Sequence, residues 1–273
     1  MTAVTDKVIV PAVERFFQRP EIRGTLEFLS SRLPASAEIF VAGGSIRNLI
    51  INLLHGQAPP TRDIDIFIGG LDRDFSLSGV LRDQTAEPTD LKGLRWYPVS
   101  SALAYDLCLL ADFVVIAAGH LEPTVENLLS GIDFTVNAVI YDFHRKLLFE
   151  NGCMAAVRDR VIDFNSRFIP DKQLIAYRIL LMGYKTGFNL SRPVFQYVKT
   201  QLDVATGIQL KGLFRAKVGR AMAAAIMGEY NALCRHPSYD AYLADRDRLV
   251  QRAAALQPGE PVPSRGRFVG PNG

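Results

Sequence analysis

The run Asp63–Gly69 constrains this chain more than any other segment. It reads Asp-Ile-Asp-Ile-Phe-Ile-Gly and alternates polar and apolar residues at the period of a β-strand. Because successive strand side chains point to opposite faces, Asp63 and Asp65 should project from the same face. Two like charges side by side repel, and burying them unpaired is costly. A shared divalent cation resolves that conflict, and Mg²⁺ prefers carboxylate oxygens together with substrate phosphates.

Two further Asp-x-Asp sequences occur, at 72–74 and 245–247. Neither lies in an apolar alternating run, so we interpret both as solvated turn or helix surface. The pair at Asp63 and Asp65 differs because a second element precedes it by about 20 residues. The functional prediction depends on finding this upstream element and the aspartate pair in that order along the chain.

The upstream element predicts a strand, a tight turn and a helix in succession. The apolar run 38–42 indicates a buried strand, and Gly43-Gly44-Ser45 follows it directly. We expect Ser45 to cap a helix over 46–55. Glycines let a backbone approach a phosphate closely, and a helix N-terminus favours an anion. Arg47 is placed to reach the same phosphates. Taken alone, the upstream element would be an ordinary strand–turn–helix, and the aspartate pair would belong to an ordinary strand. Together they predict a site that binds a triphosphate beside a metal ion.

Composition excludes several protein classes. With 273 residues, 48% hydrophobic and 22% charged, the chain has an ordinary globular balance. Three scattered cysteines without a Cys-x-x-Cys pair argue against a disulfide scaffold and a zinc ribbon. The longest apolar stretch, 101–119, is interrupted by Asp106 and Asp112, so it does not predict a membrane span. We expect a cytoplasmic protein without a membrane partner.

Charge is distributed unevenly along the chain. Residues 1–156 carry 13 Lys/Arg and 19 Asp/Glu, whereas residues 157–220 carry 12 and 4. Residues 221–273 carry 6 and 5, and the whole chain has a net charge of +3. An acidic part can hold metal ions while a basic part holds a polyanion. A solvated helical surface rich in arginine is equally compatible with these counts.

The remaining patterns divide the chain into four parts. We expect N-terminal helices over 1–35, an α/β head with a mixed sheet over 36–156, a basic α-helical neck or body over 157–256, and a disordered tail over 257–273. The individual elements expected from periodicity are two helices in 9–33 broken at Pro20, strands at 93–101 and 109–118, a helix at 124–129, a strand-like run at 134–142, and helices at 171–186, 192–206, 211–228 and 238–256.

Several ordered motifs resemble one family. V-A-G-G-S-I-R-N-L-I (41–50) followed by R-D-I-D-I-F-I (62–68) resembles the head of class II nucleotidyltransferases, the group of tRNA CCA-adding enzymes and bacterial poly(A) polymerases. D-F-T-V-N-A-V-I-Y-D (133–142) is similar to the second motif of that family. Residues 157–164 resemble the short hairpin after it, and 170–188 resemble the third motif, a basic helix. The resemblance spans about 36–192 and implies a nucleotidyltransferase head followed by a helical neck.

The resemblance also implies roles for individual residues. Asp63 and Asp65 would hold the catalytic metals, two Mg²⁺ ions or Mn²⁺ in their place. For Asn137, the alternative to nucleotide binding is a mainly structural role. The residues implied in nucleotide binding are Gly43, Gly44, Ser45, Arg47, Asp133, Asn137, Arg178 and Lys185. Arg178 and Lys185 are seven residues apart on an expected helix, so they should share a face that can meet phosphates.

A third carboxylate often completes such a site. We expect Asp112 in this role, because it opens the apolar run 113–116, with Asp106 as the alternative. The other interpretation of Asp112 is a cap at the end of a strand.

The chain also departs from the family pattern. Asn48 stands in place of the usual Asp, and Gly131-Ile132 stand in place of paired arginines. Ile175 and Leu181 occupy two positions that are arginine in the third motif, and no Glu-Asp-x-x-Arg follows. Synthesis of a CCA end therefore does not follow from the match.

The function expected from the sequence is metal-dependent transfer of NMP from an NTP to a hydroxyl group, with release of pyrophosphate. ATP is the expected donor, and an RNA 3′ end, as in tRNA processing, is the expected acceptor. A small-molecule or protein acceptor is one alternative. A non-catalytic nucleotide- or RNA-binding protein is another alternative, and it is suggested by the arginines that are missing from the second and third motifs. The oligomeric state stays open.

Overall fold

The computed structural model describes residues 2–89, 92–166, 168, 171–201 and 204–246. Its centre is a mixed sheet in the order β1-β8-β7-β2-β3-β6-β5-β4, in which β3 and β6 pair in parallel and the other neighbours are antiparallel. The strands are β1 (Thr2–Ala3), β2 (Glu38–Ala42), β3 (Asp63–Gly69), β4 (Ala86–Pro88), β5 (Leu94–Trp96), β6 (Ala104–Leu109), β7 (Val139–Asp142) and β8 (Leu147–Glu150). The predicted α/β head with a mixed sheet is confirmed.

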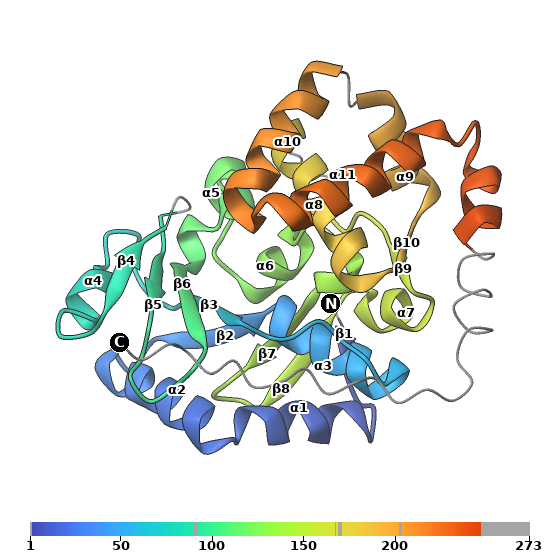
Figure 1. Ribbon diagram of the computed structural model, residues 1–273. Helices are drawn as coiled ribbons and strands as arrows, with labels where there is room; N and C mark the ends of the chain where they lie inside the picture. The colour runs from blue at the N-terminus through green and yellow to red at the C-terminus, as the bar shows by residue number, and fades with distance from the viewer. Residues whose placement is uncertain (1, 90–91, 167, 169–170, 202–203, 247–273) are drawn as a thin grey trace, which may run out of the picture.

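Helices cover both faces of this sheet and then form a separate layer beside it (Figure 1). The helices of the head are α1 (Ile9–Phe17), α2 (Pro20–Arg32), α3 (Gly44–His55), α4 (Leu77–Val80), α5 (Val114–Gly119), α6 (Val125–Gly131) and α7 (Cys153–Arg158). The C-terminal helices are α8 (Lys172–Thr186), α9 (Arg192–Gln201), α10 (Val204–Val218) and α11 (Arg220–Arg235), and residues 239–246 are also helical. A small parallel pair, β9 (Val161–Ile162) with β10 (Asn189–Leu190), joins the two parts. None of the described helices is long and apolar enough to span a membrane.

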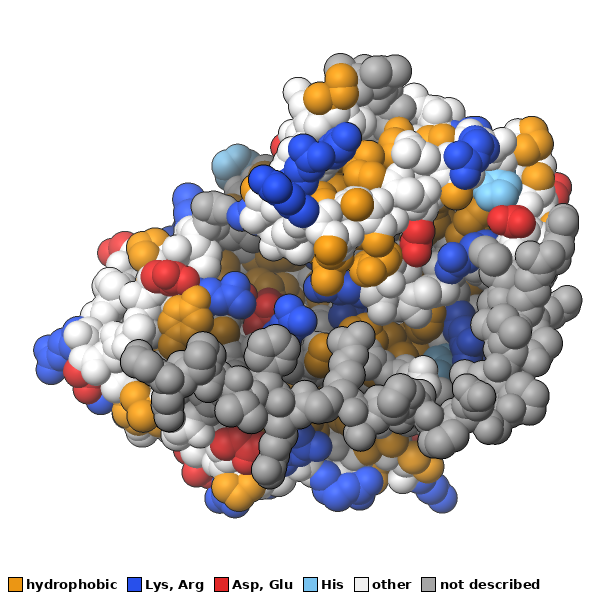
Figure 2. Space-filling model, viewed as in Figure 1, with side chains coloured by type: hydrophobic (Ala, Val, Ile, Leu, Met, Phe, Trp, Pro, Cys, Tyr) orange, Lys and Arg blue, Asp and Glu red, His pale blue; other side chains and the backbone are white. Residues whose placement is uncertain are grey.

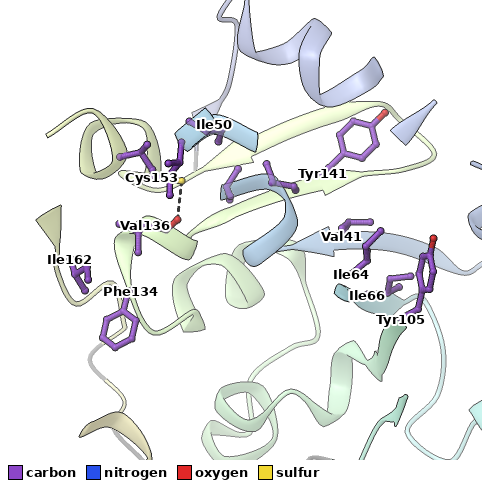
Figure 3. Packing of buried hydrophobic residues seen from close by; sticks show 14 of the residues in the cluster. Val41, Ile50, Ile64, Ile66, Tyr105, Phe134, Val136, Tyr141, Cys153 and Ile162 are labelled. Carbon is purple, nitrogen blue, oxygen red and sulfur yellow. Dashed lines mark hydrogen bonds between the residues drawn. The ribbon is translucent and has the colours of Figure 1, made fainter. Parts of the chain in front are cut away.

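Strand alternation divides the core into two layers. Ile39 and Val41 of β2 belong to the large core beneath α1, α2 and α3, part of which Figure 3 shows. Phe40 and Ala42 point the other way and pack with buried residues of α5 and α6. Each fully buried side chain of this size contributes about 1.5–3 kcal/mol to folding. The sheet register is therefore fixed strongly, because a slip of one residue would exchange the two faces.

The N-terminal helices are as predicted, with Pro20 separating them. Proline has no N–H to donate and is tolerated at the first position of a helix, where Pro20 begins α2. The apolar stripe of α1 is buried, and Phe17 stacks on Tyr141 of β7 with ring centroids 4.7 Å apart. This packing attaches the N-terminal helices to the head.

Four expected elements differ from the structure, in whole or in part. The strand expected at 109–118 is instead the end of β6, a 3₁₀ turn over Leu110–Asp112 and helix α5. Apart from Asp112 this segment is apolar, so it carried no periodicity that separates strand from helix. The strand expected at 93–101 is limited to β5, and 134–142 begins with a 3₁₀ turn before β7. In the segment 157–164, β9 pairs in parallel with the later β10 and forms no hairpin.

The C-terminal helices follow the expected pattern, with shifted ends. Residue 219 interrupts the expected helix 211–228, so α10 ends before it and α11 begins after it. The expected tail 257–273 and residues 247–256 lie outside the described residues.

We expect Gly70→Ala to lower the free energy of unfolding by about 3 kcal/mol. Gly70 has φ +69°, and an added Cβ would lie 2.1 Å from the backbone oxygen of Ser36, in the loop before β2. Backbone cannot give way as a flexible side chain can, so the turn after β3 would have to move. Denaturant unfolding monitored by circular dichroism measures the effect.

Gly56→Ala is the matched control. Gly56 also has a left-handed backbone, with φ +75°, but nothing lies within 4 Å of an added Cβ. Its cost should be only the conformational strain, about 1 kcal/mol. Equal losses for the two variants would contradict the steric explanation.

Candidate active site

Three acidic side chains and one arginine lie on one face of the sheet, across β3, β6 and β5. Parallel pairing sets Asp65 opposite Asp106, and antiparallel pairing sets Arg95 opposite Asp106. Asp63 shares the face of Asp65, and the residue between them, Ile64, is fully buried on the other side. In Figure 2, acidic and basic side chains lie together in the hollow between the sheet and the C-terminal helices.

The three carboxylates of this acidic face (Asp63, Asp65 and Asp106) are close enough for their negative charges to repel one another. Burial, together with the charges of Asp63 and Asp106, raises the pKa of Asp65 to about 7. Burial also raises the pKa of Asp106, against the opposing effect of Arg95. Asp106 Oδ1 is buried and has no hydrogen-bond partner. The fold therefore concentrates negative charge here without fully compensating it.

The composition of this face suits a divalent cation. Three hard carboxylate donors and an orphaned buried oxygen are what Mg²⁺ or Mn²⁺ would satisfy. Among the described residues, no three Asp, Glu, His or Cys side chains converge as a finished ligand set. Arg95 contacts two of the three carboxylates, at 3.4 Å from Asp63 Oδ2 and 3.5 Å from Asp106 Oδ2.

The glycine turn adjoins the acidic face. Gly43 has φ +71°, and an added Cβ would lie 3.8 Å from Asp65 Oδ2. Gly43, not Ser45, is the N-cap of α3, so the predicted capping role of Ser45 was wrong. Ser45 is instead 1% exposed, and its hydroxyl has no partner. Gly44 begins the helix, which leaves open backbone N–H groups beside the carboxylates.

Arg47 is buried and links three elements. It is 6% exposed and donates to Asn48 Oδ1, at 3.0 Å from Nε and 2.8 Å from Nη2. It also donates to Asn137 Oδ1 and, at 3.4 Å, to Met182 Sδ on α8. These partners are all neutral, and burial lowers the pKa of Arg47 even though Asp65 and Asp133 act against that shift. Arg47 thus places behind the glycine turn a cation whose hydrogen-bond partners, among the described residues, include no carboxylate.

Asp133 continues this polar network toward the C-terminal helices. Asn137 Nδ2 donates to Asp133 Oδ1 at 3.1 Å, and Arg178 Nε on α8 donates to Asp133 Oδ2. Burial alone would raise the pKa of Asp133, but the Arg178 charge and these hydrogen bonds outweigh it and lower the pKa. Asn137 is 5% exposed and central to the network, which agrees with its structural alternative.

Two more predicted residues have different outcomes. Lys185 lies on α8 within electrostatic range of Arg47, Asp63 and Arg178, so the third-motif helix faces the site. Asp112 lies in the 3₁₀ turn beyond β6, six positions past Asp106, and does not join the acidic face. The alternative, Asp106, occupies that place. The sequence signal for Asp106 was the alternation of polar and apolar residues in Ala104–Leu109, which resembles the alternation in β3.

Arg95 was missed by the sequence analysis. It lies in a three-residue strand whose neighbours, Leu94 and Trp96, pack on the opposite face. A pattern this short identifies no strand partner, so its position opposite Asp106 could not be inferred.

We expect Arg178→Met to lower the free energy of unfolding by about 2 kcal/mol at pH 7. The change leaves Asp133, whose side chain is 12% exposed, without its cation, and the 46% exposure of Arg178 moderates the effect. Because the folded-state pKa of Asp133 is lowered, this stabilisation is present above the unfolded pKa and is lost as pH falls through the folded one. The difference between variant and wild type should therefore shrink below about pH 4 in denaturant titrations.

Arg23→Met is the control, because Arg23 pairs with Glu27 at the surface, with side chains 54% and 53% exposed. Its effect should be small at every pH, since exposed pairs contribute little. An Arg178 effect that does not depend on pH would contradict the role given to Asp133.

Comparison with known proteins finds similar solved structures but no similar sequence family. No protein-family profile and no curated protein matches the chain. A solved CCA-adding enzyme in complex with ATP matches with a TM-score of 0.58 and 16% identity, over 85% of this chain and 56% of its own. The Thermotoga maritima CCA-adding enzyme complexed with tRNA matches with 0.58 and 17%, over 85% and 55%.

A third structure, an apo form of a tRNA-processing enzyme, matches with a TM-score of 0.53 and 14% identity, over 85% of this chain and 58% of its own. The chain spans a little over half the length of these structures. At such identities the likeness shows the fold alone. The chain shares the fold of these CCA-adding and tRNA-processing enzyme structures over most of its length, as its motifs predicted.

Proposed function

We propose that this protein is a metal-dependent nucleotidyltransferase that moves NMP from an NTP, with ATP as the expected donor, to a hydroxyl group and releases pyrophosphate. The observation that carries the proposal is the adjacency of the glycine turn and the acidic face, where a Cβ added at Gly43 would lie 3.8 Å from Asp65 Oδ2. A helix N-terminus opened by glycines binds phosphate, and carboxylates bind a divalent cation. One metal–nucleotide complex can therefore contact both.

In this proposal the acidic face holds Mg²⁺ through Asp63, Asp65 and Asp106. The chemistry that bound metal supplies in such a site is a lowered pKa for the attacking hydroxyl and neutralisation of charge on the leaving pyrophosphate. Asp106 replaces the expected Asp112, and its buried, unpartnered Oδ1 is the atom that most needs a cation. Mn²⁺ has a compatible preference for oxygen ligands.

The residues of the glycine turn would bind and orient the triphosphate. Gly44 and Ser45 carry the first N–H groups of α3, whereas the Gly43 N–H donates to the Val139 backbone oxygen at 3.1 Å. The orphaned Ser45 hydroxyl can also donate to an anion. Arg47 stays in its polar network and contributes mainly through its charge, because hydrogen bonds to Asn48, Asn137 and Met182 engage most of its N–H donors. Lys185 adds a second positive charge from α8.

An RNA 3′ end, such as that of a tRNA, is the acceptor that we propose. The neighbouring structures include a complex with tRNA, and the second part of this chain is basic. Exposed basic side chains follow one another along α10 and the start of α11: Lys211, Arg215, Lys217 and Arg220. Such a surface binds a phosphate backbone mainly through charge.

We expect Asp63→Asn and Asp65→Asn each to reduce nucleotide incorporation by about 10²–10³-fold, the scale of a lost electrostatic stabiliser. Asp65→Asn should not lower the free energy of unfolding, because it removes a buried charge crowded by two others. Incorporation of labelled NTP with Mg²⁺ and total RNA, beside denaturant unfolding, measures both quantities.

The doubly changed Asp72→Asn/Asp74→Asn protein is the control. It alters the same Asp-x-Asp spacing in an exposed turn, so incorporation should stay at the wild-type level. Full incorporation by either Asp63→Asn or Asp65→Asn would refute the assignment. The same assay identifies the acceptor, and labelling of a protein or metabolite would favour the alternative acceptors.

We expect RNA affinity to fall steeply with salt concentration and to weaken in Lys211→Ala/Arg215→Ala. Losing two phosphate contacts should reduce the slope of log K against log[salt] by about 1.4–1.8. Fluorescence anisotropy with labelled RNA at several KCl concentrations measures this slope.

Lys7→Ala/Arg15→Ala removes one Lys and one Arg, both exposed, from the N-terminal region at the opposite face of the sheet. That variant should keep the wild-type slope. Identical behaviour of the two double variants would contradict the RNA surface on α10, and a weak salt dependence of turnover would favour a small acceptor.

A further inference from the structure

We propose that Arg95 is an internal counter-ion that competes with divalent cations for the acidic face and thereby sets how tightly the protein binds metal. The inference rests on the proposed function, because it assumes a cation on Asp63, Asp65 and Asp106. It adds a residue outside the sequence motifs to the control of that site.

The position of Arg95 is fixed by strand pairing. Antiparallel pairing with β6 sets Arg95 directly opposite Asp106, and the fully buried Trp96 next to it anchors β5 on the other face. From there Arg95 Nη2 lies 3.4 Å from Asp63 Oδ2, and Nη1 lies 3.5 Å from Asp106 Oδ2. The two ends of one guanidinium thus bridge carboxylates of two different strands. A cation shared by these carboxylates would lie within a few ångströms of the guanidinium, and the two positive charges would repel each other.

The bridge is loose enough to be displaced. Charge-assisted N–H···O contacts are usually about 2.7–2.9 Å long, so both distances are those of weak pairs. The side chains of Arg95, Asp63 and Asp106 are 35%, 47% and 28% exposed. Water screens pairs of this kind, and an arginine side chain can rotate away without disturbing the strand.

The bridge also leaves the charge of the site incomplete. Arg95 brings one positive charge to three carboxylates. Asp106 Oδ1 keeps no partner, and the Asp65 carboxylate accepts no hydrogen bond from any residue in the described part of the chain. A divalent cation can satisfy these atoms, whereas Arg95 reaches only the outer oxygens. Arg95 therefore lowers metal affinity and does not abolish it.

The test is Mn²⁺ binding by Arg95→Gln without nucleotide, measured by titration of the free-Mn²⁺ EPR signal at fixed pH. Removing the competing charge should tighten Mn²⁺ binding by roughly tenfold, as expected for unit charges a few ångströms apart in a hydrated site. Arg73→Gln makes the same change in net charge at an exposed position and should leave affinity unchanged. Arg95→Lys retains one charge but spans one carboxylate, so its affinity should lie between wild type and Arg95→Gln.

Mn²⁺ binding that is equally tight in wild type and Arg95→Gln, or weaker in the variant, would overturn this proposal and leave the proposed function intact. Addition of Asp63→Asn to Arg95→Gln should abolish the tight binding. If no protein binds Mn²⁺ in a manner dependent on Asp63, both proposals fail. Should Arg95→Gln not fold, the Arg95→Lys titration decides, and affinity no tighter than wild type would count against the proposal.

Discussion

The parallel pairing of β3 with β6 forces Asp65 and Asp106 into adjacent positions, and the core enforces that pairing. On the opposite face the same register buries Ile64, Ile66 and Tyr105 completely. Each of these side chains contributes about 1.5–3 kcal/mol, and a slip of one residue would move them all into the site. A site that is unfavourable by itself is thus held in place by burial on its reverse side.

A second constraint connects the head to the C-terminal helices. Arg47, Asn137, Asp133 and Arg178 form a continuous polar chain from α3 to α8. Asn48, which stands where the family usually has Asp, accepts from Arg47 without neutralising it. The guanidinium charge therefore remains available to an anion, whereas an Asp there would have compensated it. This departure is consistent with an anion site behind the glycine turn.

Local sequence patterns predicted the strands at 38–42 and 63–69 to the residue, because each alternation or apolar run ends at a glycine. The site was harder to predict, since it depends on which strands become neighbours. Asp112 was chosen from a run without periodicity, whereas Asp106 reaches the site only through the pairing of β6 with β3. Arg95 depends on two such pairings. Residues brought together across a sheet carry no short-range signal of their proximity.

In the proposed function, the charges of the site favour binding of metal and nucleotide together. Three carboxylates stand on one side, and Arg47, Lys185 and the first N–H groups of α3 stand on the other. A metal cation alone would neutralise the carboxylates but would be repelled by Arg47 and Lys185. A free triphosphate would be attracted by these basic groups but repelled by the carboxylates. A metal–triphosphate complex presents opposite charges to both groups at once. Metal and nucleotide should therefore each raise the affinity for the other, and by thermodynamic linkage the two effects are equal.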